Sequence, residues 1–385
     1  MDGLLWLYGP SGVGKTSVGW ELFRRLEGPV GYVDADQVGL CYPPSGDDPD
    51  NHRLKARNVA AVSGTFRRAG ARSLIVSGYL NSAEVRDAYA ARLPAEPVVW
   101  CRLRVDEREL RERFGRRGWA PHLVEQTVAE AEELDRTDFA DLCVDTSGMS
   151  VAEVADQVWG RVAGRQDRSA VAGNGAGPGP STGPGPATGP AGGPVPVLWL
   201  CGPPAVGKSS VGYEVFTQVN RSGVRAAYLD LAQVGFCRPA PDEVRISNLA
   251  AVWANHLAAG ARCLVMTGQV TSDEVVGRYA GALPGATLTV CRLGAGADEL
   301  VERVMRRGRG EGPQLAGDGL RGQPADVLRR RAEEAVATAR ALDRARVGDV
   351  CVDTGGRSVR EVARLVRASA GGWPNGTDHG RRGGG

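Results

Sequence analysis

The amino-acid sequence predicts an α/β protein built from two tandem domains, each a five-stranded parallel sheet flanked by helices. Three observations support this prediction. Short apolar runs alternate with segments of helical periodicity, which is typical of parallel sheets. One glycine-rich motif occurs twice, at residues 9–16 and 202–209, each time after an apolar run. A segment of Gly, Pro, Ala, Ser and Thr without periodicity lies between the two copies.

These observations divide the chain of 385 residues into four parts. We expect the first domain at residues 1–164 and the second at residues 195–370. Residues 165–194 lack the apolar side chains of a core and are predicted to be a flexible linker. Residues 371–385 are predicted to be a disordered tail. Because each half holds a complete set of five predicted strands, we expect the halves to fold independently.

The first half shows the elements of such a domain in order. Its strands are predicted at residues 4–8, 30–33, 73–76, 98–101 and 142–144. Its helices are predicted after residue 16, at 52–69, from 82, from 106 to 118, at 121–134 and from 150. Asp106 and Glu109 have the spacing of a capping box. Residues 41–51 are rich in Pro, Gly and Asp and are predicted to be a loop.

The second half repeats the first. Residues 230–237 align with residues 34–41, and residues 259–264 align with residues 69–74. The second half is longer in one glycine-rich stretch, residues 308–323, after its predicted arginine-bearing helix. The repeat predicts the same fold in both halves.

The repeated motif matches the pattern G-x-x-x-x-G-K-[ST], the P-loop, which surrounds an anion with a glycine turn and a helix start. Gly12 and Gly14 let the backbone curl where a Cβ would intrude. Lys15 is expected to reach the β- and γ-phosphates of a nucleotide, and the Thr16 hydroxyl to bind Mg²⁺. The alternative is an ordinary glycine-rich turn. The predicted nucleotide-binding residues are Gly9, Ser11, Gly12, Val13, Gly14, Lys15, Thr16, Ser17, Gly202, Ala205, Val206, Gly207, Lys208, Ser209, Ser210 and Arg303.

Lysine is scarce in this chain. Among 47 Lys and Arg residues, only Lys15, Lys55 and Lys208 are lysines. Two of them lie in the glycine-rich motifs, where a compact ammonium fits beneath phosphates better than a guanidinium does.

Two carboxylates, Asp34 and Asp36, follow the second predicted strand. At alternate positions at the carboxyl end of a strand, both can face the crevice where open sheets bind ligands. Asp34 is expected to hold Mg²⁺, and Asp36 to orient an acceptor hydroxyl and take its proton. The alternative is a solvated turn with Asx capping. The predicted metal ligands are Thr16, Asp34, Ser209 and Asp230.

Basic residues complete the predicted site. Arginines that precede a glycine at the end of a predicted helix can stack on adenine and neutralise charge during phosphate transfer. They recur at the same positions in both halves: Arg113, Arg116, Arg117, Arg303, Arg306 and Arg307. The predicted catalytic residues are Lys15, Asp36, Arg113 and Arg117. The predicted acceptor contacts are Asp36, Arg53, Lys55, Arg57 and Gly78. The three basic contacts favour an anionic acceptor if they line the cleft; the alternative is the solvated turn of an amphipathic helix.

Composition narrows the class of function. The net charge is +2 and no block of basic residues occurs, which weighs against nucleic acid as an obligatory partner. The start of the chain does not resemble a signal peptide, and no apolar run approaches the roughly 20 residues of a membrane span. We therefore expect a cytoplasmic protein with no membrane partner. The eight cysteines form no C-x-x-C pair and are expected to be reduced, those in strand-like runs as small core residues.

Two further features separate classes of P-loop protein. The third predicted strand ends at Ser77-Gly78, without the acidic pair of motor-type ATPases. Neither half contains an N-K-x-D motif of the kind that P-loop GTPases use to read the base. Asp145 ends the last strand, where a structural role is favoured. The pattern favours a kinase.

At these residues the chain resembles the small P-loop kinases, which include shikimate, gluconate, adenylylsulfate and nucleoside monophosphate kinases. The resemblance covers each half almost end to end. Besides the loops it rests on Asp34-Ala35-Asp36, on Arg113 with Arg116-Arg117, and on Asp145-Thr146. It implies the strand order 2-3-1-4-5, ATP and Mg²⁺ as cofactors, and a mobile lid after Arg117.

The leading hypothesis is an ATP-dependent phosphotransferase acting on a small hydroxyl- or phosphate-bearing acceptor. One alternative is a regulatory protein that senses ATP without turnover; the others are a nucleoside monophosphate kinase and a polynucleotide 5′-hydroxyl kinase. The counterpart of Asp36 in the second half is Ala232, so the first half is expected to be the more active. The sequence does not indicate an oligomeric state.

Overall fold

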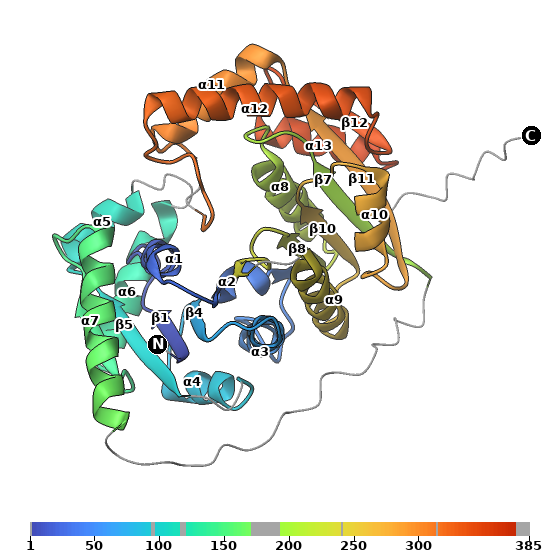
Figure 1. Ribbon diagram of the computed structural model, residues 1–385. Coiled ribbons are helices and arrows are strands. Elements are labelled where there is room, and N and C mark those ends of the chain that lie inside the picture. Colours follow the sequence, from blue (N-terminus) through green and yellow to red (C-terminus); the bar gives the residue numbers. More distant parts are fainter. Residues whose placement is uncertain are drawn as a thin grey trace, which may run out of the picture.

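The computed structural model describes residues 2–93, 97–115, 121–170, 193–239, 242–312 and 315–374. The chain forms two six-stranded sheets, one built mainly from each half, and helices flank both sheets (Figure 1). Each sheet is parallel except at one edge. The predicted α/β fold with two sheets is therefore confirmed.

The described residues of the first half form six strands, one of which was not predicted. They are β1 (Gly3–Tyr8), β2 (Val30–Asp34), β3 (Cys41–Tyr42), β4 (Ser73–Ser77), β5 (Val98–Arg104) and β6 (Leu142–Asp145). The helices are α1 (Lys15–Arg25), α2 (Ala35–Val38), α3 (His52–Arg68), α4 (Ala83–Ala90), α5 (Glu107–Gly115), a 3₁₀ turn at Pro121–Leu123, α6 (Val124–Asp135) and α7 (Val151–Ala170).

The second half follows the same plan. Its strands are β7 (Val195–Cys201), β8 (Ala226–Asp230), β9 (Cys237–Arg238), β10 (Cys263–Thr267), β11 (Ala286–Gly294) and β12 (Val350–Asp353). Its helices are α8 (Lys208–Arg221), α9 (Asp242–Ala258), α10 (Asp273–Ala280), α11 (Ala297–Gly308), α12 (Ala325–Arg344) and α13 (Val359–Ser369).

Strand β1 illustrates why the sequence adopts this arrangement. All six of its residues are buried, and alternate residues belong to cores on opposite faces of the sheet. Leu4 and Trp6 pack into one core, whereas Leu5 and Leu7 pack into the other. Burial on both faces is typical of a central parallel strand between two helical layers.

The strand order of each sheet differs from the predicted five-stranded one because a sixth strand is added at one edge. The first sheet has the order β6-β5-β1-β4-β2-β9, and the second has β12-β11-β7-β10-β8-β3. Within the first sheet, the five predicted strands keep the relative order 2-3-1-4-5. The additional strand of each sheet comes from the opposite half of the chain.

The two halves exchange these edge strands reciprocally. Strand β3 pairs antiparallel with β8 of the second half, and β9 pairs antiparallel with β2 of the first half. The Tyr32 amide donates to the Phe236 carbonyl at 2.8 Å, and the Tyr228 amide donates to the Leu40 carbonyl at 2.9 Å. The prediction of residues 41–51 as loop throughout is therefore wrong at β3. A two-residue strand is too short to show periodicity, and its partner lies far away in the sequence.

A single core joins the two halves. Helix α3 packs against α9, and one cluster of buried side chains contains Trp6 and Phe66 of the first half together with Trp199 and Trp253 of the second. In Figure 1 both helices lie between the two sheets. The expectation of independent folding did not include this shared core, which gives each half buried surface that it cannot cover alone.

The described residues also refine the predicted boundaries. Helix α7 continues to Ala170, six residues into the predicted linker, and residues 171–192 lie outside the described residues. Trp373, in the predicted tail, is 3% exposed, and its carbonyl accepts from Arg367 Nε at 3.0 Å. The expectation of disorder from residue 371 is therefore wrong at Trp373; residues 375–385 lie outside the described residues.

The cysteines of the strands differ in burial. Cys143 and Cys351 are exposed rather than core residues, because β6 and β12 are edge strands, whereas Cys101 and Cys291 are buried as expected.

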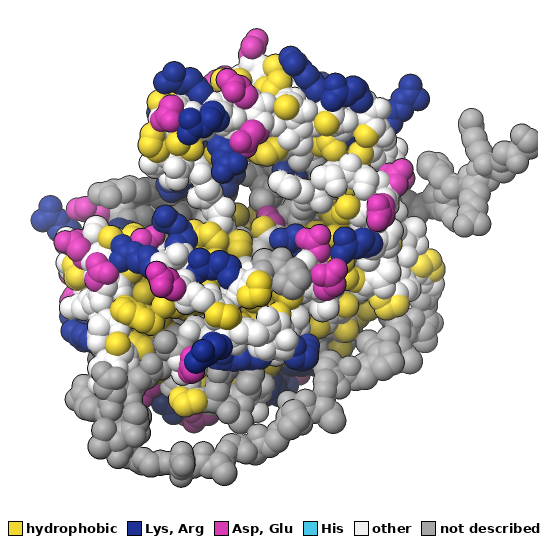
Figure 2. Space-filling model, in the orientation of Figure 1, with side chains coloured by type: hydrophobic (Ala, Val, Ile, Leu, Met, Phe, Trp, Pro, Cys, Tyr) yellow, Lys and Arg dark blue, Asp and Glu magenta, His cyan; other side chains and the backbone are white. Residues whose placement is uncertain are grey.

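On the face in Figure 2, Lys and Arg side chains are interspersed with Asp and Glu. Among the described helices, none combines the length and apolar character needed to cross a membrane.

Candidate active site

The first P-loop lies between β1 and α1, and its lysine side chain folds back onto the start of the loop. Gly12 and Gly14 have φ of 89° and 106°, left-handed conformations that glycine adopts without strain. The Lys15 ammonium donates to the carbonyls of Gly9 at 2.9 Å and Pro10 at 3.0 Å. Ser11 is exposed, Val13 is buried, and Thr16 and Ser17 lie in the first turn of α1. The predicted loop residues therefore form one cradle at the start of a helix.

The second P-loop repeats this geometry with one difference. Lys208 Nζ donates to the carbonyls of Gly202 at 3.1 Å and Pro203 at 2.9 Å. Ala205 replaces Gly12 and keeps a left-handed φ of 61°, which is strained for a residue with a Cβ. Burial lowers the pKa of Lys208 to about 8, and Arg307 acts in the same direction.

The remaining predicted residues of the second loop surround the same turn. Val206 is buried, Gly207 has a φ of 103°, and Ser209 and Ser210 lie in the first turn of α8. The second loop therefore keeps the lysine and the hydroxyl of the first, although Pro204, at the position of Ser11, has no group to donate.

Each half also brings a hydroxyl and a carboxylate together beside its loop. Thr16 Oγ1 donates to Asp34 Oδ2 at 2.9 Å, and Ser209 Oγ donates to Asp230 Oδ2 at 2.7 Å. Burial raises the pKa of Asp34, and the charge of Asp36 adds to this, although Thr16 and Lys15 act in the opposite direction. A carboxylate whose charge is disfavoured in this way gains from a cation beside it. These oxygen ligands fit Mg²⁺, which takes few protein ligands and completes its shell with phosphates and water.

No group of three or more His, Cys, Asp or Glu side chains suited to a metal occurs among the described residues. A magnesium ion in either site would therefore depend on nucleotide phosphates for the rest of its ligands.

The carboxylates of Asp34 and Asp36 have different partners. Asp34 caps α2, because its Oδ1 accepts from the amides of Asp36 at 3.0 Å and Gln37 at 3.3 Å, so the alternative capping interpretation holds for this residue. The side chain of Asp36 is 39% exposed, and Lys55 Nζ donates to its Oδ1 at 2.9 Å. Burial acts to raise the pKa of Asp36, but Lys55 and Lys15 outweigh it, so the pKa lies below its ordinary value and Asp36 is ionised at neutral pH.

Lys55 and Gly78 both lie next to α2. Lys55 is only 12% exposed, and its stem packs against Gly39, where a Cβ would collide with it. A Cβ on Gly78 would lie 2.8 Å from the Ala35 Cβ, so this glycine lets α2 approach β4. All three lysines of the chain are thus in or beside a P-loop site.

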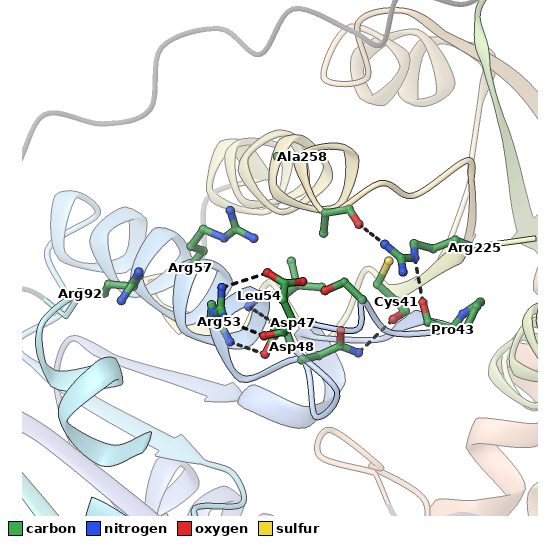
Figure 3. Close-up of a pocket in the computed structure, with 13 residues that line it drawn as sticks. Cys41, Pro43, Asp47, Asp48, Arg53, Leu54, Arg57, Arg92, Arg225 and Ala258 are labelled. Atoms are coloured by element: carbon green, nitrogen blue, oxygen red, sulfur yellow. Dashed lines mark hydrogen bonds and ion pairs between the residues drawn. The ribbon is translucent and has the colours of Figure 1, made fainter. Parts of the chain in front are cut away.

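Two of the predicted acceptor contacts do not lie with Asp36. Arg53 and Arg57 line a separate cavity of about 310 Å³ between the halves, together with Arg92 and Arg225 (Figure 3). Arg53 forms an ion pair with Asp47 at 3.0 Å. The reason is helical geometry: positions 53 and 57 share one face of α3, whereas position 55 points elsewhere. The expectation that Arg53, Lys55 and Arg57 act together is therefore not met.

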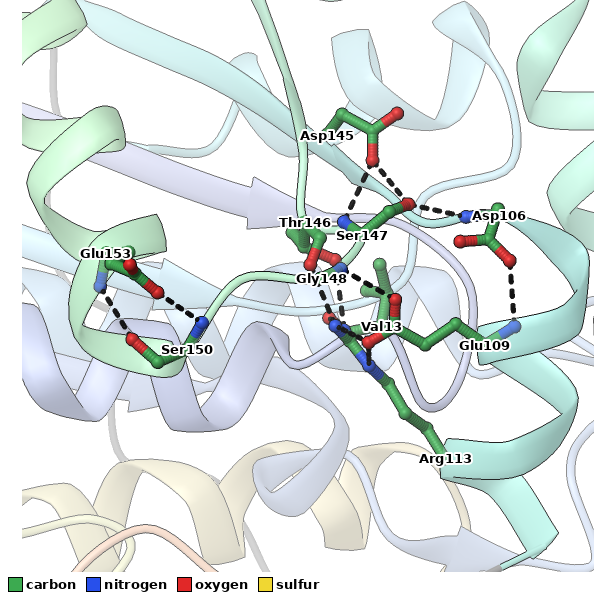
Figure 4. Close-up of polar contacts among 10 residues, drawn as sticks. All are labelled: Val13, Asp106, Glu109, Arg113, Asp145, Thr146, Ser147, Gly148, Ser150 and Glu153. Carbon is green, nitrogen blue, oxygen red and sulfur yellow. Dashed lines mark hydrogen bonds and ion pairs between the residues drawn. The ribbon is translucent and has the colours of Figure 1, made fainter.

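Arg113 holds the first P-loop rather than projecting free into the site (Figure 4). Its guanidinium donates to the Val13 carbonyl at 3.2 Å, to Thr146 Oγ1 at 3.0 Å and to the Thr146 carbonyl at 2.8 Å. It also forms an ion pair with Glu109 Oε1 at 2.6 Å. The capping box of Glu109 with Asp106 is only half formed, because the Glu109 carboxylate instead binds Arg113 and the Gly148 amide.

The second half repeats this clamp. Arg303 donates to the Val206 carbonyl at 2.9 Å and to Thr354 Oγ1 at 2.8 Å, and it pairs with Glu299. Arg116 and Arg117 lie outside the described residues. Their counterparts Arg306 and Arg307 are described. Arg306 pairs with Glu311 at 2.7 Å, and Arg307 pairs with Asp318 of the longer glycine-rich stretch at 3.0 Å.

The acceptor side of the second half is different. Ala232 provides no carboxylate where Asp36 stands in the first half. Arg245, the counterpart of Lys55, lies 3.9 Å from Asp242, and Glu243 pairs with Arg278 at 3.3 Å. The pair formed by Asp36 and Lys55 therefore has no equivalent.

Sequence reasoning missed residues that reach helix α1, which follows the first P-loop, from the opposite half. The Phe236 ring lies 4.7 Å from the Trp20 ring of α1, and the Arg238 guanidinium lies 4.8 Å from the centre of the Phe23 ring. The repeat itself carried a signal, since each half has a Gly, an apolar residue and a Cys after its strand, followed by a Pro two residues on. That shared pattern indicates a common structural role, although not a partner.

These loops, with the α/β fold around them, define a P-loop architecture that occurs twice in the chain. A family model described as an AAA domain matches residues 6–137, about a third of the chain and all within the first half. This match agrees with the P-loop resemblance predicted from the sequence.

Solved structures with similarity to the chain include P-loop kinases. A tunicamycin resistance protein from Deinococcus radiodurans has 24% identity and a TM-score of 0.35, over 42% of this chain and 96% of that chain. The adenylylsulfate (APS) kinase CysC of Mycobacterium tuberculosis has 18% identity and a TM-score of 0.30, over 46% and 99%. A gluconokinase from Sinorhizobium meliloti has 20% identity and a TM-score of 0.31, over 46% and 92%. A search of the curated proteins found no match.

Proposed function

We propose that this chain is an ATP- and Mg²⁺-dependent phosphotransferase whose first half transfers the γ-phosphate to a small hydroxyl- or phosphate-bearing acceptor. The observation that carries the proposal is the pair of Asp36 and Lys55, 2.9 Å apart, at the carboxyl end of β2. This end of an open parallel sheet is where ligands bind, and the P-loop with Lys15 opens on the same side.

In this proposal, the acceptor oxygen attacks the γ-phosphorus while the bond from that phosphorus to the β–γ bridging oxygen breaks, and ADP leaves. Asp36 takes the proton of the acceptor hydroxyl, for which its lowered pKa keeps it ionised at neutral pH. Lys15 and the loop amides neutralise charge on the phosphates. Lys55 holds one oxygen of Asp36, leaving the other to face the acceptor.

Thr16 and Asp34 are the residues that would hold Mg²⁺. When bound there, the ion supplies positive charge to the phosphates. Arg113 stabilises the loop, because its guanidinium donates to the Val13 carbonyl. We therefore assign Arg113 to positioning the loop, and the predicted role of Arg117 remains a proposal.

The acceptor is proposed to be a small molecule rather than a nucleic acid. An anionic acceptor is no longer favoured, because Arg53 and Arg57 line the separate cavity and only Lys55 lies beside Asp36. Neutral polyols therefore belong among the acceptors to be tested, beside phosphate-bearing ones.

For the second half we propose a nucleotide site that transfers slowly or not at all. Lys208, Ser209 and Asp230 preserve the geometry of the nucleotide side, whereas Ala232 leaves no base. This half is the one to which the alternative of ATP sensing without turnover applies.

The test is to incubate the full-length chain with ATP, Mg²⁺ and a panel of hydroxyl-bearing acceptors that includes both neutral polyols and the anions gluconate, shikimate and adenylylsulfate. We expect a phosphorylated product and stoichiometric ADP with at least one acceptor. Tight ATP binding without ADP formation across a broad metabolite panel would instead favour the sensor.

A further inference from the structure

Helix α2, which carries Asp36, is too short to be stable alone. It spans four residues, Ala35–Val38, and an isolated helix of that length does not persist in water. Its first turn is capped by Asp34, but the carbonyls at its end need partners. The orientation of Asp36 therefore depends on what holds the end of α2.

The end of α2 is held from both halves of the chain. The Val38 carbonyl accepts from Asn58 Nδ2 at 2.6 Å and makes a second contact, of 3.1 Å, with His256 Nε2 of α9. Asn255, the neighbour of His256, donates from Nδ2 to Asn58 Oδ1 at 2.9 Å. This contact fixes the amide of Asn58 so that its nitrogen points at Val38.

His256 is suited to be a donor at this position. It is 1% exposed, and burial lowers its pKa to about 4, so the ring is neutral at pH 7. Because a carbonyl oxygen only accepts, Nε2 carries the single proton of the ring. His256 Nδ1 is buried without a partner among the described residues, so the fold keeps a costly polar group here for one hydrogen bond.

The second half lacks the equivalent contacts. Asn248, the counterpart of Asn58, donates to the Val234 carbonyl at 2.7 Å, but its Oδ1 is buried without a partner in the described chain. The positions that match Asn255 and His256 are Thr65, which bonds to Ala61 of its own helix, and Phe66, which has no donor. Residues 231–234, the counterpart of α2, form a turn rather than a helix.

We propose that Asn255 and His256 of the second half are positioning residues for Asp36. They hold Asn58 and the Val38 carbonyl, and so keep α2 in the orientation that presents Asp36 to the acceptor. The role of Asp36 in this inference rests on the proposed function. The second half thereby contributes to a reaction for which its own site lacks the base.

The test uses the full-length chain with His256→Phe, which installs the residue found at position 66, and His256→Gln, which keeps an N–H donor. Val252→Ala is the matched control, since Val252 is buried one turn earlier on the same helix and its side chain has no hydrogen-bonding group. Hydrogen exchange of a peptide covering residues 34–41 reports the stability of α2 without requiring an acceptor. Turnover is measured in parallel at varied ATP.

We expect His256→Phe to speed exchange in residues 34–41 about tenfold and to lower kcat about 10- to 100-fold, with the KM for ATP within about twofold of the wild type. His256→Gln is expected to restore both values most of the way. Unchanged exchange in His256→Phe would overturn the inference, as would faster exchange with an unchanged kcat or equal effects of Val252→Ala. If the wild type transfers no phosphate, the proposed function fails, and the exchange data alone decide whether His256 holds α2.

Discussion

The two halves of the molecule agree on the nucleotide side of the candidate site and differ on the acceptor side. In each half, a lysine ammonium bridges two loop carbonyls, a hydroxyl binds a carboxylate, and an arginine holds the carbonyl of the loop valine, Val13 or Val206. On the acceptor side, the first half has Asp36 paired with Lys55, whereas the second has Ala232. The nucleotide geometry therefore does not depend on the acceptor residues.

This difference indicates a division of roles. The second half keeps the loop geometry of the nucleotide side and contributes a strand, a helix and two polar side chains to the first half. In the proposed function, the first half carries the residues for transfer.

The largest expected effect concerns separation of the halves. Cutting the chain within residues 171–192 is expected to leave the two pieces associated, whereas each half expressed alone is expected to lose its fold. Separation exposes side chains such as Phe66 and Trp253, each contributing roughly 1.5–3 kcal/mol by burial, against a total stability of about 5–15 kcal/mol. Copurification and thermal unfolding of cut, intact and separate forms measure this.

One cooperative transition for the cut chain, with separate halves that aggregate or remain unfolded, agrees with the shared core. Two stable monomeric halves with the unfolding temperature of the intact protein would show that the exchanged strands add little.

The next effect separates the two loops. Lys15→Ala is expected to remove one of two ATP sites and to reduce phosphate transfer at least 100-fold, because a fixed cation beneath the phosphates is lost. Lys208→Ala is expected to remove the other site while most of the transfer remains. Calorimetry gives the number of sites, and ADP formation gives the transfer. Equal loss of transfer in both variants would break the proposed division of roles.

A smaller effect is expected from pH at the second loop. Burial lowers the pKa of Lys208 to about 8, so its ammonium loses its proton as the pH rises through that value. Because ATP favours the charged form, affinity is expected to fall about tenfold per pH unit above pH 8, until the pKa of the bound form is reached. Titration of ATP into Lys15→Ala between about pH 7 and about pH 9.5 isolates this site. A flat affinity over that range would contradict the assignment.

Local patterns predicted much of the fold and the nucleotide side. Strand β1, the loop at Gly9 and the start of α1 were predicted together because burial, turn chemistry and helical spacing are all encoded within about 25 residues. Asp34 and Asp36 were predicted for the same reason. The capping contact at Asp34 follows from these local elements, whereas Arg113 reaches the Val13 carbonyl from 100 positions along the chain.

Contacts between distant segments could not be predicted in this way. Strands β3 and β9 have two residues each and gain their partners only when the halves meet. Arg53 lines a cavity between the halves, and Arg225 of the second half lines the same cavity. The sequence of α3 alone does not show this. His256 looked like any helical residue, because the carbonyl that it binds lies in the other half.

The central claim is that transfer takes place in the first half through Asp36, and Asp36→Asn in the full-length chain tests it most directly. Asp47→Asn is the matched control, since Asp47 also pairs with a basic residue of α3 but lines the separate cavity. We expect Asp36→Asn to lower turnover about 10²–10⁴-fold while both ATP sites bind as before, and Asp47→Asn to stay within about twofold of the wild type. Turnover near the wild-type rate in Asp36→Asn would show that Asp36 is not the base and would contradict the account.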